Sequence, residues 1–404
     1  MPAPVRFNDG GRLLIDLYLP SAFISMTQGL VVPTIPTMSG AFGVPAAVAA
    51  QVVTALVLGR ALMTIPSGIL IDRLGRKPAM TVGPALLIAG SFLSAVTPGF
   101  GGVLAGQFLA GAGSALWQLG REVAAVDLIK PEMRGRMLAL FFGLQSAGQT
   151  LGPLLGGIST DRWGFQTVFW AGLAIGLLVL AMTARLPETG RRGAAAKRPL
   201  LEFGSPRDLP PEFRVTYLVL IAATFAAGTR NPVVAAILPL HAERAFGFSS
   251  TEVGVLFAVM GAVTLAAMGP AGWVSDKIGR KAATVPAALL SGVAFLLYPY
   301  ASTLWALIAV SALVGIASGF ALGAMTVYTY DIAPAHARGR LQALRRTMNE
   351  LGGVAGPAAA GGTLSLAGTG LAFLALAPLH LASAALLAVG ARETAGKYRG
   401  RIVV

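Results

Sequence analysis

A few ionisable residues stand inside long apolar stretches of this chain, where an unpaired charge is strongly unfavourable. Arg60 and Arg230 each lie near the middle of such a stretch, too deep for an extended side chain to reach water easily. Charges in this position usually face a cavity or one another. Each arginine could therefore hold an anionic or carbonyl-bearing molecule, or neutralise a buried acid. Asn231 and Pro232 interrupt the stretch beside Arg230, which favours a binding role there.

A second group of polar residues follows one face of the fourth apolar stretch. They recur every three or four positions, the spacing of one helical face: Gln107, Gly111, Ser114, Gln118 and Glu122. Trp117 and Arg121 form the adjoining row. A polar stripe of this kind predicts a wet lumen, with Trp117 and Gln118 as contacts to a bound molecule.

The eleventh apolar stretch gathers Arg345, Arg346, Asn349 and Glu350 within two helical turns. One interpretation makes Glu122 or Glu350 a carrier of protons, because burial disfavours the charged form of a carboxyl group. The other is a salt-bridge gate between two bundles, formed by five residues: Arg121, Glu122, Arg345, Arg346 and Glu350. Asp16, just inside the first stretch, is either a further coupling residue or a solvated residue at the interface.

A lipid bilayer must position these residues, because the composition excludes a soluble protein. Of the 404 residues, 55% are hydrophobic and 12% are charged, which is too apolar for a soluble chain. Segments of about 20 apolar residues, the length that crosses a bilayer, begin near twelve positions: Leu13, Val48, Ala79, Val103, Leu138, Val168, Val215, Val253, Ala282, Leu304, Leu341 and Leu371. The sequence predicts an all-α membrane protein with twelve transmembrane helices.

The two halves of the chain carry the same motifs in constant register. The segment 68–77 recurs at 272–281, and the segment 134–136 recurs at 338–340, each 204 residues later. Such a duplication is typical of secondary transporters built from two parallel halves. We therefore expect two pseudo-symmetric six-helix bundles, residues 1–184 and 215–404, joined by a cytoplasmic linker at 185–214.

Basic residues are concentrated on one side of the predicted membrane spans. Of the 31 Lys and Arg residues, 24 lie on the side that carries both termini and the linker, whereas the opposite loops hold Arg162 and Arg244. Basic loops resist translocation, so both termini are expected in the cytoplasm and the protein in the inner membrane. The same residues explain the net charge of +14 as topology signals that face anionic lipid, without nucleic acid. No cleavage site follows the first residues, so we expect the first helix to be retained.

Several classes of function are not favoured by the sequence. The chain has no cysteine, and its three histidines, His241, His336 and His380, lack the spacing of metal ligands, so we expect neither a metal nor a cofactor. There is no glycine-rich phosphate loop or nucleophile elbow, and the linker is too short and too basic to be catalytic. An enzyme, or a receptor that binds without transport, is therefore a minor alternative.

One repeated motif carries a family resemblance. The loop after the second predicted helix matches the pattern Gly-x-Leu-x-Asp-Arg-x-Gly-Arg-Lys at seven positions: Gly68, Leu70, Asp72, Arg73, Gly75, Arg76 and Lys77. This pattern resembles the signature of the major facilitator superfamily, and the chain is similar to its twelve-helix drug/proton antiporter group. The resemblance implies two bundles that rock about a central site and expose it alternately to each side.

The residues of this motif suit a conformational latch. Gly68 would let two helices approach closely, and Asp72 would accept from free amides at a neighbouring helix start. The resemblance implies that Arg76 pairs with the acid at the inner end of the fourth helix, which is Asp127. The simpler alternative is that the charges are only topology signals. With the second copy included, the expected latch consists of Gly68, Asp72, Arg73, Arg76, Asp127, Asp276, Arg280 and Asp331, in which Asp331 would serve Arg280.

The fifth predicted helix carries a glycine motif that resembles the one associated with antiporters among drug exporters. Its residues are Gly148, Gly152, Pro153, Gly156 and Gly157. Small residues every fourth position make a smooth face for close helix packing, and a proline bends the helix. The resemblance favours export, although a packing seam alone would explain the same residues.

The sequence as a whole predicts a proton-coupled exporter of small organic molecules that works by alternating access in the lipid bilayer, with one chain sufficient. Met325 and Tyr328 join the expected binding residues, since the tenth helix lines the cavity in the resembled family. The alternative is a carrier of organic or inorganic anions, because five arginines stand within the spans against three acids. The family's exporter pattern has an arginine where Gln107 stands, which leaves that coupling route in question.

Overall fold

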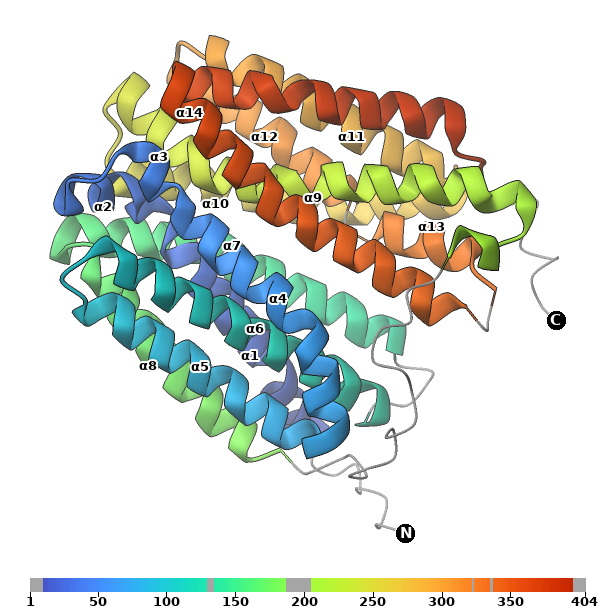
Figure 1. The fold of residues 1–404 in the computed structure, drawn as a ribbon, viewed down its shortest axis with the longest axis horizontal. Helices are drawn as coiled ribbons and strands as arrows, with labels where there is room; N and C mark the ends of the chain where they lie inside the picture. The colour runs from blue at the N-terminus through green and yellow to red at the C-terminus, as the bar shows by residue number, and fades with distance from the viewer. Residues whose placement is uncertain (1–9, 129–133, 187–204, 322, 335–336, 395–404) are drawn as a thin grey trace.

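The computed structural model describes residues 10–128, 134–186, 205–321, 323–334 and 337–394. Every regular element in these residues is helical, which confirms the predicted all-α class. Figure 1 shows two bundles side by side, one formed by the first half of the chain (blue to green) and the other by the second half (yellow-green to red).

The N-terminal half forms six crossings. They are α1 (Gly10–Leu30), continued by η2 (Val32–Thr34) and α2 (Ile35–Phe42); α4 (Gln51–Leu74), preceded by α3 (Ala46–Ala49); α5 (Arg76–Val96); α6 (Phe100–Leu128); α7 (Arg134–Trp163); and α8 (Gln166–Ala184). Gly75 separates α4 from α5 with φ of 100°, a conformation that glycine adopts far more readily than other residues. This geometry explains why the repeated motif has a glycine at position 75.

The C-terminal half repeats the six crossings with two irregularities. Its elements are η4 (Pro206–Asp208), α9 (Pro211–Phe246), α10 (Ser250–Lys277), α11 (Arg280–Leu297), η5 (Tyr298–Tyr300), α12 (Leu304–Ala321), α13 (Ala324–Ile332) and α14 (Arg338–Gly390). The elements α12 and α13 together make one crossing. The long α14 makes two, because it folds back at Gly368, whose φ is 83°. The described residues therefore contain the twelve predicted crossings.

Three of these crossings are less apolar than the rest. In the described residues, nine segments are long and apolar enough to span a membrane, and they do not include α6, α7 or the first part of α14. The polar residues singled out from the sequence lie mainly on these three, for example Gln118 on α6 and Glu350 on α14. Because lipid cannot solvate such groups, these helices must turn their polar faces toward protein or water.

Among the described residues, the apolar core joins the two halves at one end and is divided at the other. We call the end where α4 and α10 finish the basic end, since it carries Arg73, Lys77, Lys277 and Lys281, and the opposite end the distal end. One cluster of buried side chains near the distal end contains residues of both halves. Toward the basic end the described clusters are separate, with one in the C-terminal half and two in the N-terminal half. The bundles diverge in that direction (Figure 1).

The glycine motif of α7 packs against one helix of each half. A Cβ atom added to Gly148, Gly152 or Gly156 would lie 2.1, 2.5 or 2.1 Å from a backbone oxygen of α1. On the neighbouring face, a Cβ atom on Gly157 would lie 2.2 Å from the carbonyl oxygen of Ser250 in α10. The motif is therefore a packing seam that lets helices approach more closely than larger residues would allow.

Gly148→Ala should destabilise the protein, because α1 would have to move away from α7. We expect a loss of about 1–3 kcal/mol, typical of an overpacked core, seen as a lower thermal unfolding midpoint in detergent. Gly143 on the same helix is the matched control, since a Cβ atom there meets nothing within 4 Å. Gly143→Ala should be neutral or stabilising by about 0.5–1 kcal/mol. Equal midpoints for the two variants would contradict the seam.

Candidate functional site

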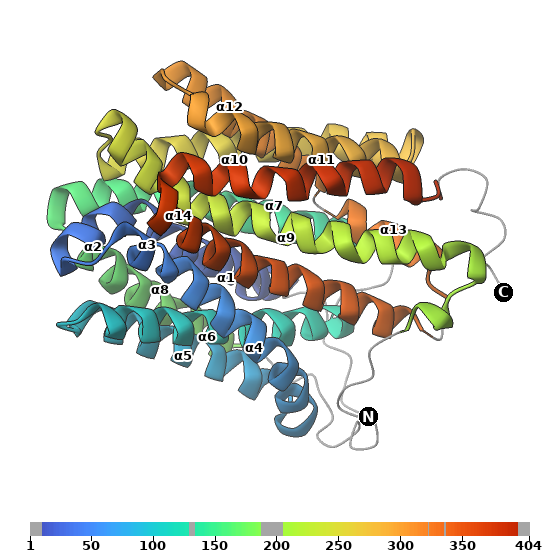
Figure 2. The same ribbon diagram turned by 45° about the horizontal axis from the view of Figure 1, so that its top comes forward.

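Between the distal end, where the apolar core joins the halves, and the basic end, where the described cores are separate, the halves also meet through charged side chains. The Nε of Arg60, on α4, donates to Oε2 of Glu350, on the first part of α14, over 3.0 Å. The exposed fractions of the two side chains are 25% and 12%, so the pair is largely shielded. The helix α4 and this part of α14 lie side by side (Figures 1 and 2). Arg60 thus neutralises an acid of the other half.

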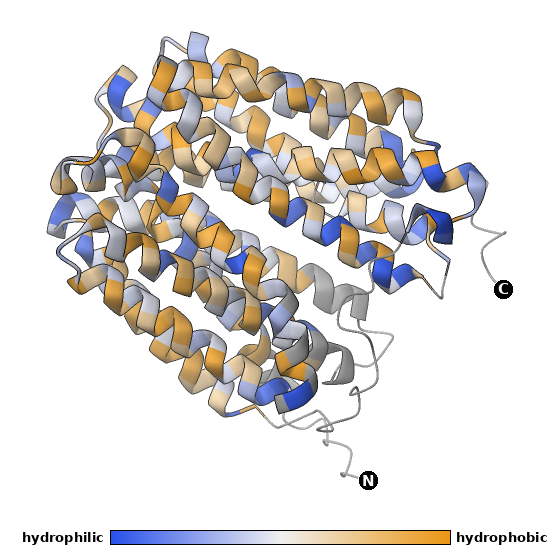
Figure 3. Ribbon diagram, viewed as in Figure 1, coloured by the Kyte–Doolittle hydropathy of each residue, from blue (hydrophilic) through white to orange (hydrophobic). Residues whose placement is uncertain are grey.

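A second ion pair lies one helical turn closer to the basic end. The Nη1 of Arg346 donates to Oε2 of Glu122, on α6, over 3.2 Å. Arg346 and Glu350 are four residues apart on α14 and so share one face. Figure 3 shows hydrophilic residues recurring along this part of the helix. We call Arg60, Glu122, Arg346 and Glu350 the charge ladder.

The charge ladder joins the halves through two arginines and two glutamates. Of these four groups, only the glutamates can readily change their charge. A guanidinium stays protonated in proteins, whereas a protonated carboxyl group loses its attraction for a neighbouring cation. Glu122 and Arg346 are 35% and 34% exposed, so water can reach this part of the ladder. The arrangement can hold the halves together when both carboxylates are charged and weaken that joint when either takes up a proton.

Arg121 is next to the charge ladder in sequence but points into the N-terminal half. It is 2% exposed, and its guanidinium carbon lies 3.5 Å from the centroid of the Phe141 ring, a cation–π contact. Its Nη2 atom lies 3.9 Å from Oε1 of Glu122. Arg121 therefore supports Glu122 from within its own half and does not bridge the halves. Asp16, the other acid expected near this region, is half-buried on α1.

Arg345 also stays within its own half, contrary to the expected gate. Its Nε donates to Oε1 of Gln342 over 2.8 Å, and its Nη2 donates to Oγ1 of Thr326 over 2.9 Å. Adjacent residues on a helix do not share a face. Since Arg346 points toward the N-terminal half, Arg345 is directed toward α13 instead.

Arg230 lies inside the C-terminal half. Its residue surface is 5% exposed, its Nη1 donates to Oγ of Ser291 on α11 over 3.1 Å, and its Nε donates to Oδ1 of Asn231 over 3.4 Å. No carboxylate of the described residues pairs with it. Asn231 also accepts from Ser318 over 3.1 Å and is exposed. Of these two expected binding residues, Asn231 is therefore the more accessible.

The aromatic and methionine residues expected at the site fill the cores of their own halves. Trp117 is 1% exposed, and its Nε1 donates to Oγ1 of Thr183 on α8 over 3.2 Å. Met325 and Tyr328 are 7% and 0% exposed and belong to the buried cluster of the C-terminal half. The structure does not bring them to the space between the halves. Gln118 is half-buried on α6.

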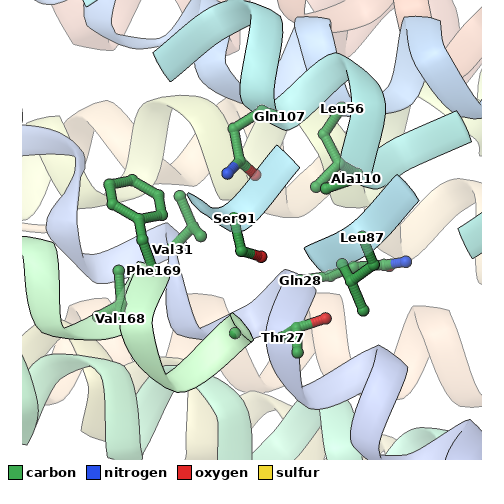
Figure 4. Close-up of a pocket in the computed structure, with 11 residues that line it drawn as sticks. Thr27, Gln28, Val31, Leu56, Leu87, Ser91, Gln107, Ala110, Val168 and Phe169 are labelled. Atoms are coloured by element: carbon green, nitrogen blue, oxygen red, sulfur yellow. The ribbon is translucent and has the colours of Figure 1, made fainter. Parts of the chain in front are cut away.

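A small cavity lies inside the N-terminal half, where the polar stripe of α6 was expected to face an open lumen. Gln107 is 3% exposed, and its Nε2 donates to Oγ of Ser94 over 3.4 Å. The cavity has a volume of about 10 Å³, enough for roughly one water molecule. Figure 4 shows Gln107, Ser91, Thr27 and Gln28 among the side chains around it. The distal part of the stripe is thus internal, and Glu122 at its other end reaches the C-terminal half.

The C-terminal copy of the repeated motif forms an ion-pair network within its own half. Arg280 donates from Nε to Oδ2 of Asp331 over 2.8 Å and from Nη1 to Oδ1 of Asp276 over 2.7 Å. Glu393, which no sequence pattern had indicated, accepts from the backbone amides of Arg280 and Lys281 over 2.7 and 3.0 Å. An acid beside the first turn of a helix is favoured by the helix dipole. The role of this network as a latch stays a prediction.

The N-terminal copy is only partly described. The side chains of Asp72 and Asp127 lie outside the described part of the structure, Arg73 is exposed, and Arg76 is half-buried. Among the described residues, the close approach expected at Gly68 is not seen, because a Cβ atom on Gly68 would meet none of their atoms within 4 Å. This open space agrees with the separation of the halves at the basic end.

Two regions of the chain, residues 17–229 and 218–401, match the family model described as Major Facilitator Superfamily. The chain belongs to the major facilitator superfamily. It is therefore a membrane transporter and not an enzyme. The chain is similar in structure to a D-xylose-proton symporter, with a TM-score of 0.79 and 15% identity over 97% of this chain and 99% of that one. It is also similar to the human organic anion transporter MFSD10, with a TM-score of 0.68 and 21% identity over 93% and 99%. Both likenesses concern the superfamily fold alone.

Relatives within the superfamily include proteins named as exporters. Citrate exporter 1 of Aspergillus niger is 27% identical over 45% of this chain and 34% of its own length. Multidrug resistance protein Stp of Mycobacterium tuberculosis is 30% identical over 33% and 25%. Multidrug resistance protein 1 of Bacillus subtilis is 22% identical over 62% and 64%. The matched region spans about a third of the length of the first of these relatives.

Arg60→Ala and Glu350→Ala should each destabilise this superfamily member, and the double variant should lose less than the sum. Each single variant leaves a shielded charge unpaired, so we expect a coupling energy of about 1–3 kcal/mol from unfolding in detergent. Glu252 is the control acid, because its carboxylate accepts from the amide of Ser249 at the distal end. Arg60→Ala and Glu252→Ala should be additive. Additivity of the Arg60 and Glu350 variants would rule out the pair.

Proposed function

We propose that the protein exports small organic molecules in exchange for protons by alternating access. The observation that supports this proposal is the charge ladder, which joins the halves between a distal end where apolar side chains of both halves pack together and a basic end where the described cores are separate. A transporter of this kind rocks its halves about a fixed site near mid-membrane. Joints that respond to charge at that depth suit such a movement.

We propose that the protein lies in the inner membrane and that its basic end faces the cytoplasm. The positive-inside rule supports this orientation, because the turns that follow α4 and α10 at this end carry several lysines and arginines. In this orientation the structure has the halves apart on the cytoplasmic side, so a molecule could enter from the cytoplasm. One chain contains both halves, and a monomer would therefore suffice.

Proton coupling is proposed to act through Glu350 and Glu122. While both are charged, the pairs with Arg60 and Arg346 hold the first part of α14 against α4 and α6. Protonation of a carboxyl group removes its charge but leaves the guanidinium charged. The halves would then separate more easily along the ladder, and deprotonation on the other side of the membrane would restore the joint.

The direction and substrate class are supported by the relatives and by the glycine motif of α7. Relatives named as multidrug resistance proteins and as an exporter favour outward movement of organic molecules. The anion carrier is the weaker alternative, because two of the five intramembrane arginines, Arg60 and Arg346, are already paired with acids of the chain. Two arginines that neutralise the protein's own carboxylates are not free to attract an anion.

The proposal can be tested in proteoliposomes with a trapped pH-sensitive dye. A lipophilic cation such as ethidium, or an organic anion such as fluorescein, would be supplied with and without a proton gradient. Glu350→Gln should abolish transport driven by the gradient but retain exchange of labelled for unlabelled compound, since exchange needs no net proton movement. Glu252→Gln, which removes an acid at the distal end, should keep both activities.

Three outcomes would speak against the proposal. Unchanged gradient-driven transport in Glu350→Gln would exclude that acid from coupling. Transport of the anion alone, insensitive to the pH gradient, would favour the anion carrier. Binding of compounds without movement across a sealed membrane would remove the transport proposal for these substrates.

A further inference from the structure

A separate polar contact joins the two halves at the distal end. Asp161 lies in the last turn of α7, and its Oδ1 and Oδ2 atoms accept from the backbone amides of Ser250 and Thr251 over 3.1 and 2.7 Å. These residues are the first two of α10. Since α7 belongs to the N-terminal half and α10 to the C-terminal half, one carboxylate caps a helix of the other half.

The helix α10 already has a cap of its own. Oγ of Ser249 accepts from the amide of Glu252 over 3.3 Å, and Oε2 of Glu252 accepts from the amide of Ser249 over 2.8 Å. This reciprocal box satisfies part of the helix start. The amides of Ser250 and Thr251 take no part in this box and still require hydrogen-bond acceptors, and a helix start also favours a negative charge. Asp161 supplies the acceptor oxygens and the negative charge from the other half.

The residues around Asp161 fit the same contact. Pro153, Gly157 and Asp161 are spaced by four and therefore follow one face of α7. A Cβ atom on Gly254 of α10 would lie 2.5 Å from the carbonyl oxygen of Pro153, and one on Gly157 would lie 2.2 Å from that of Ser250. The close approach made possible by the two glycines brings the start of α10 within reach of the carboxylate.

We propose that Asp161 is the latch of the distal gate, which holds the outer side shut by capping α10 and must release that helix when the halves open outward. This inference rests on the proposed alternating access. It gives the glycine motif of α7 and Asp161, which follows the motif on the same helix, a shared role in closing the distal end. The seam brings the helices together, and Asp161 supplies a contact that exists only while they are together.

The latch should hold across the physiological pH range. The amides of Ser250 and Thr251 donate to the carboxylate of Asp161, and hydrogen bonds to the charged form of a carboxyl group favour that form. We therefore expect the carboxylate to stay charged and the contact to persist from pH 8 to pH 5.

Other charged groups near Asp161 include two acids and a base. Glu243 of α9 lines the same cavity of about 200 Å³ as Asp161, Glu252 stands in the first turn of α10, and Arg162 follows Asp161 on α7. The cavity gives water access to the latch. Release would therefore come from movement of the halves, driven at the charge ladder, and not from titration of Asp161 between pH 5 and 8.

Paired spin labels would test the latch, because the chain has no cysteine of its own. Gly99→Cys in the turn before α6 and Ser302→Cys in the turn before α12 place one label on each half at exposed distal positions. A Cβ atom at Gly99 meets nothing within 4 Å. Distances between the labels would be measured in lipid nanodiscs by pulsed electron paramagnetic resonance from pH 8 to pH 5.

Asp161→Asn should increase the population in which the two labels are far apart by about two- to fivefold, because a charge at a helix terminus stabilises the helix by a free energy that corresponds to this factor. The ratio of this population in the variant to that in the wild type should stay the same from pH 8 to pH 5. Asp161→Glu should restore most of the short-distance population, and Glu252→Gln, which removes a charge from the same helix start within one half, should change the distribution little.

Identical distributions for Asp161→Asn and the wild type would overturn the latch, and so would an equal shift in Glu252→Gln. The outcome is separable from the proposed function. If the distances shift as expected but no compound moves in proteoliposomes, the latch stands and the transport proposal fails. If gradient-driven transport is present and the distances do not shift, the latch alone fails.

Discussion

The structure depends on one constraint, which is that a charged side chain in the middle of a bilayer must find a partner inside the protein. Lipid cannot solvate Arg60 or Glu350, and each would be strongly unfavourable alone. Their pairing over 3.0 Å meets this constraint across the two halves of the chain instead of within one of them. The same requirement that keeps these charges out of lipid therefore also draws α4 against α14, and it makes the joint between the halves depend on charge.

The joints between the halves differ along the membrane normal. Near the distal end they are apolar contacts, close glycine packing and the cap that Asp161 forms on α10, and we expect none of them to change its charge between pH 5 and pH 8. Toward the basic end the described cores are separate, and ion pairs take their place. Because apolar packing is non-directional while an ion pair can lose its attraction when one partner is neutralised, the two regions respond to different signals. This difference suits a transporter whose two gates must not open together.

The sequence predicted the parts of this structure that depend on period, length and repetition. Twelve long segments and the register of the duplication follow from spacing alone, and the partner of Arg280 follows from that register together with the family resemblance. Which neighbour a helical face meets depends on tertiary packing, which no spacing encodes. Arg345 and Arg346 are adjacent in sequence, yet only Arg346 reaches the other half. Spacing likewise placed Trp117 beside the expected lumen, but packing directs it to α8, where it donates a hydrogen bond to Thr183. The partner of Arg60 is 290 residues away, beyond what a local pattern can indicate.

The duplication that shaped the fold did not duplicate the charge ladder. At the positions 204 residues away from Arg60, Glu122, Arg346 and Glu350 the chain has Thr264, Thr326, Phe142 and Ser146, none of which is ionisable. At the equivalent depth, the seam between α7 and α10 is instead closed by neutral contacts such as Ser146 with Met268 and Thr150 with Gly261, and the charge of Asp161 lies at its distal end.

A proton taken up by the ladder would therefore act directly on one of the two pseudo-symmetric seams, and the other seam would change only through the movement that follows. The middle of the seam between α7 and α10 would keep the halves in contact while the α14 seam parts and the Asp161 latch at the distal end releases, so that the movement is a rotation about α7 and α10 and not a complete separation. The two bundles are symmetric, but their charges are not. On this view, that difference decides which seam parts and which seam serves as the axis of rotation.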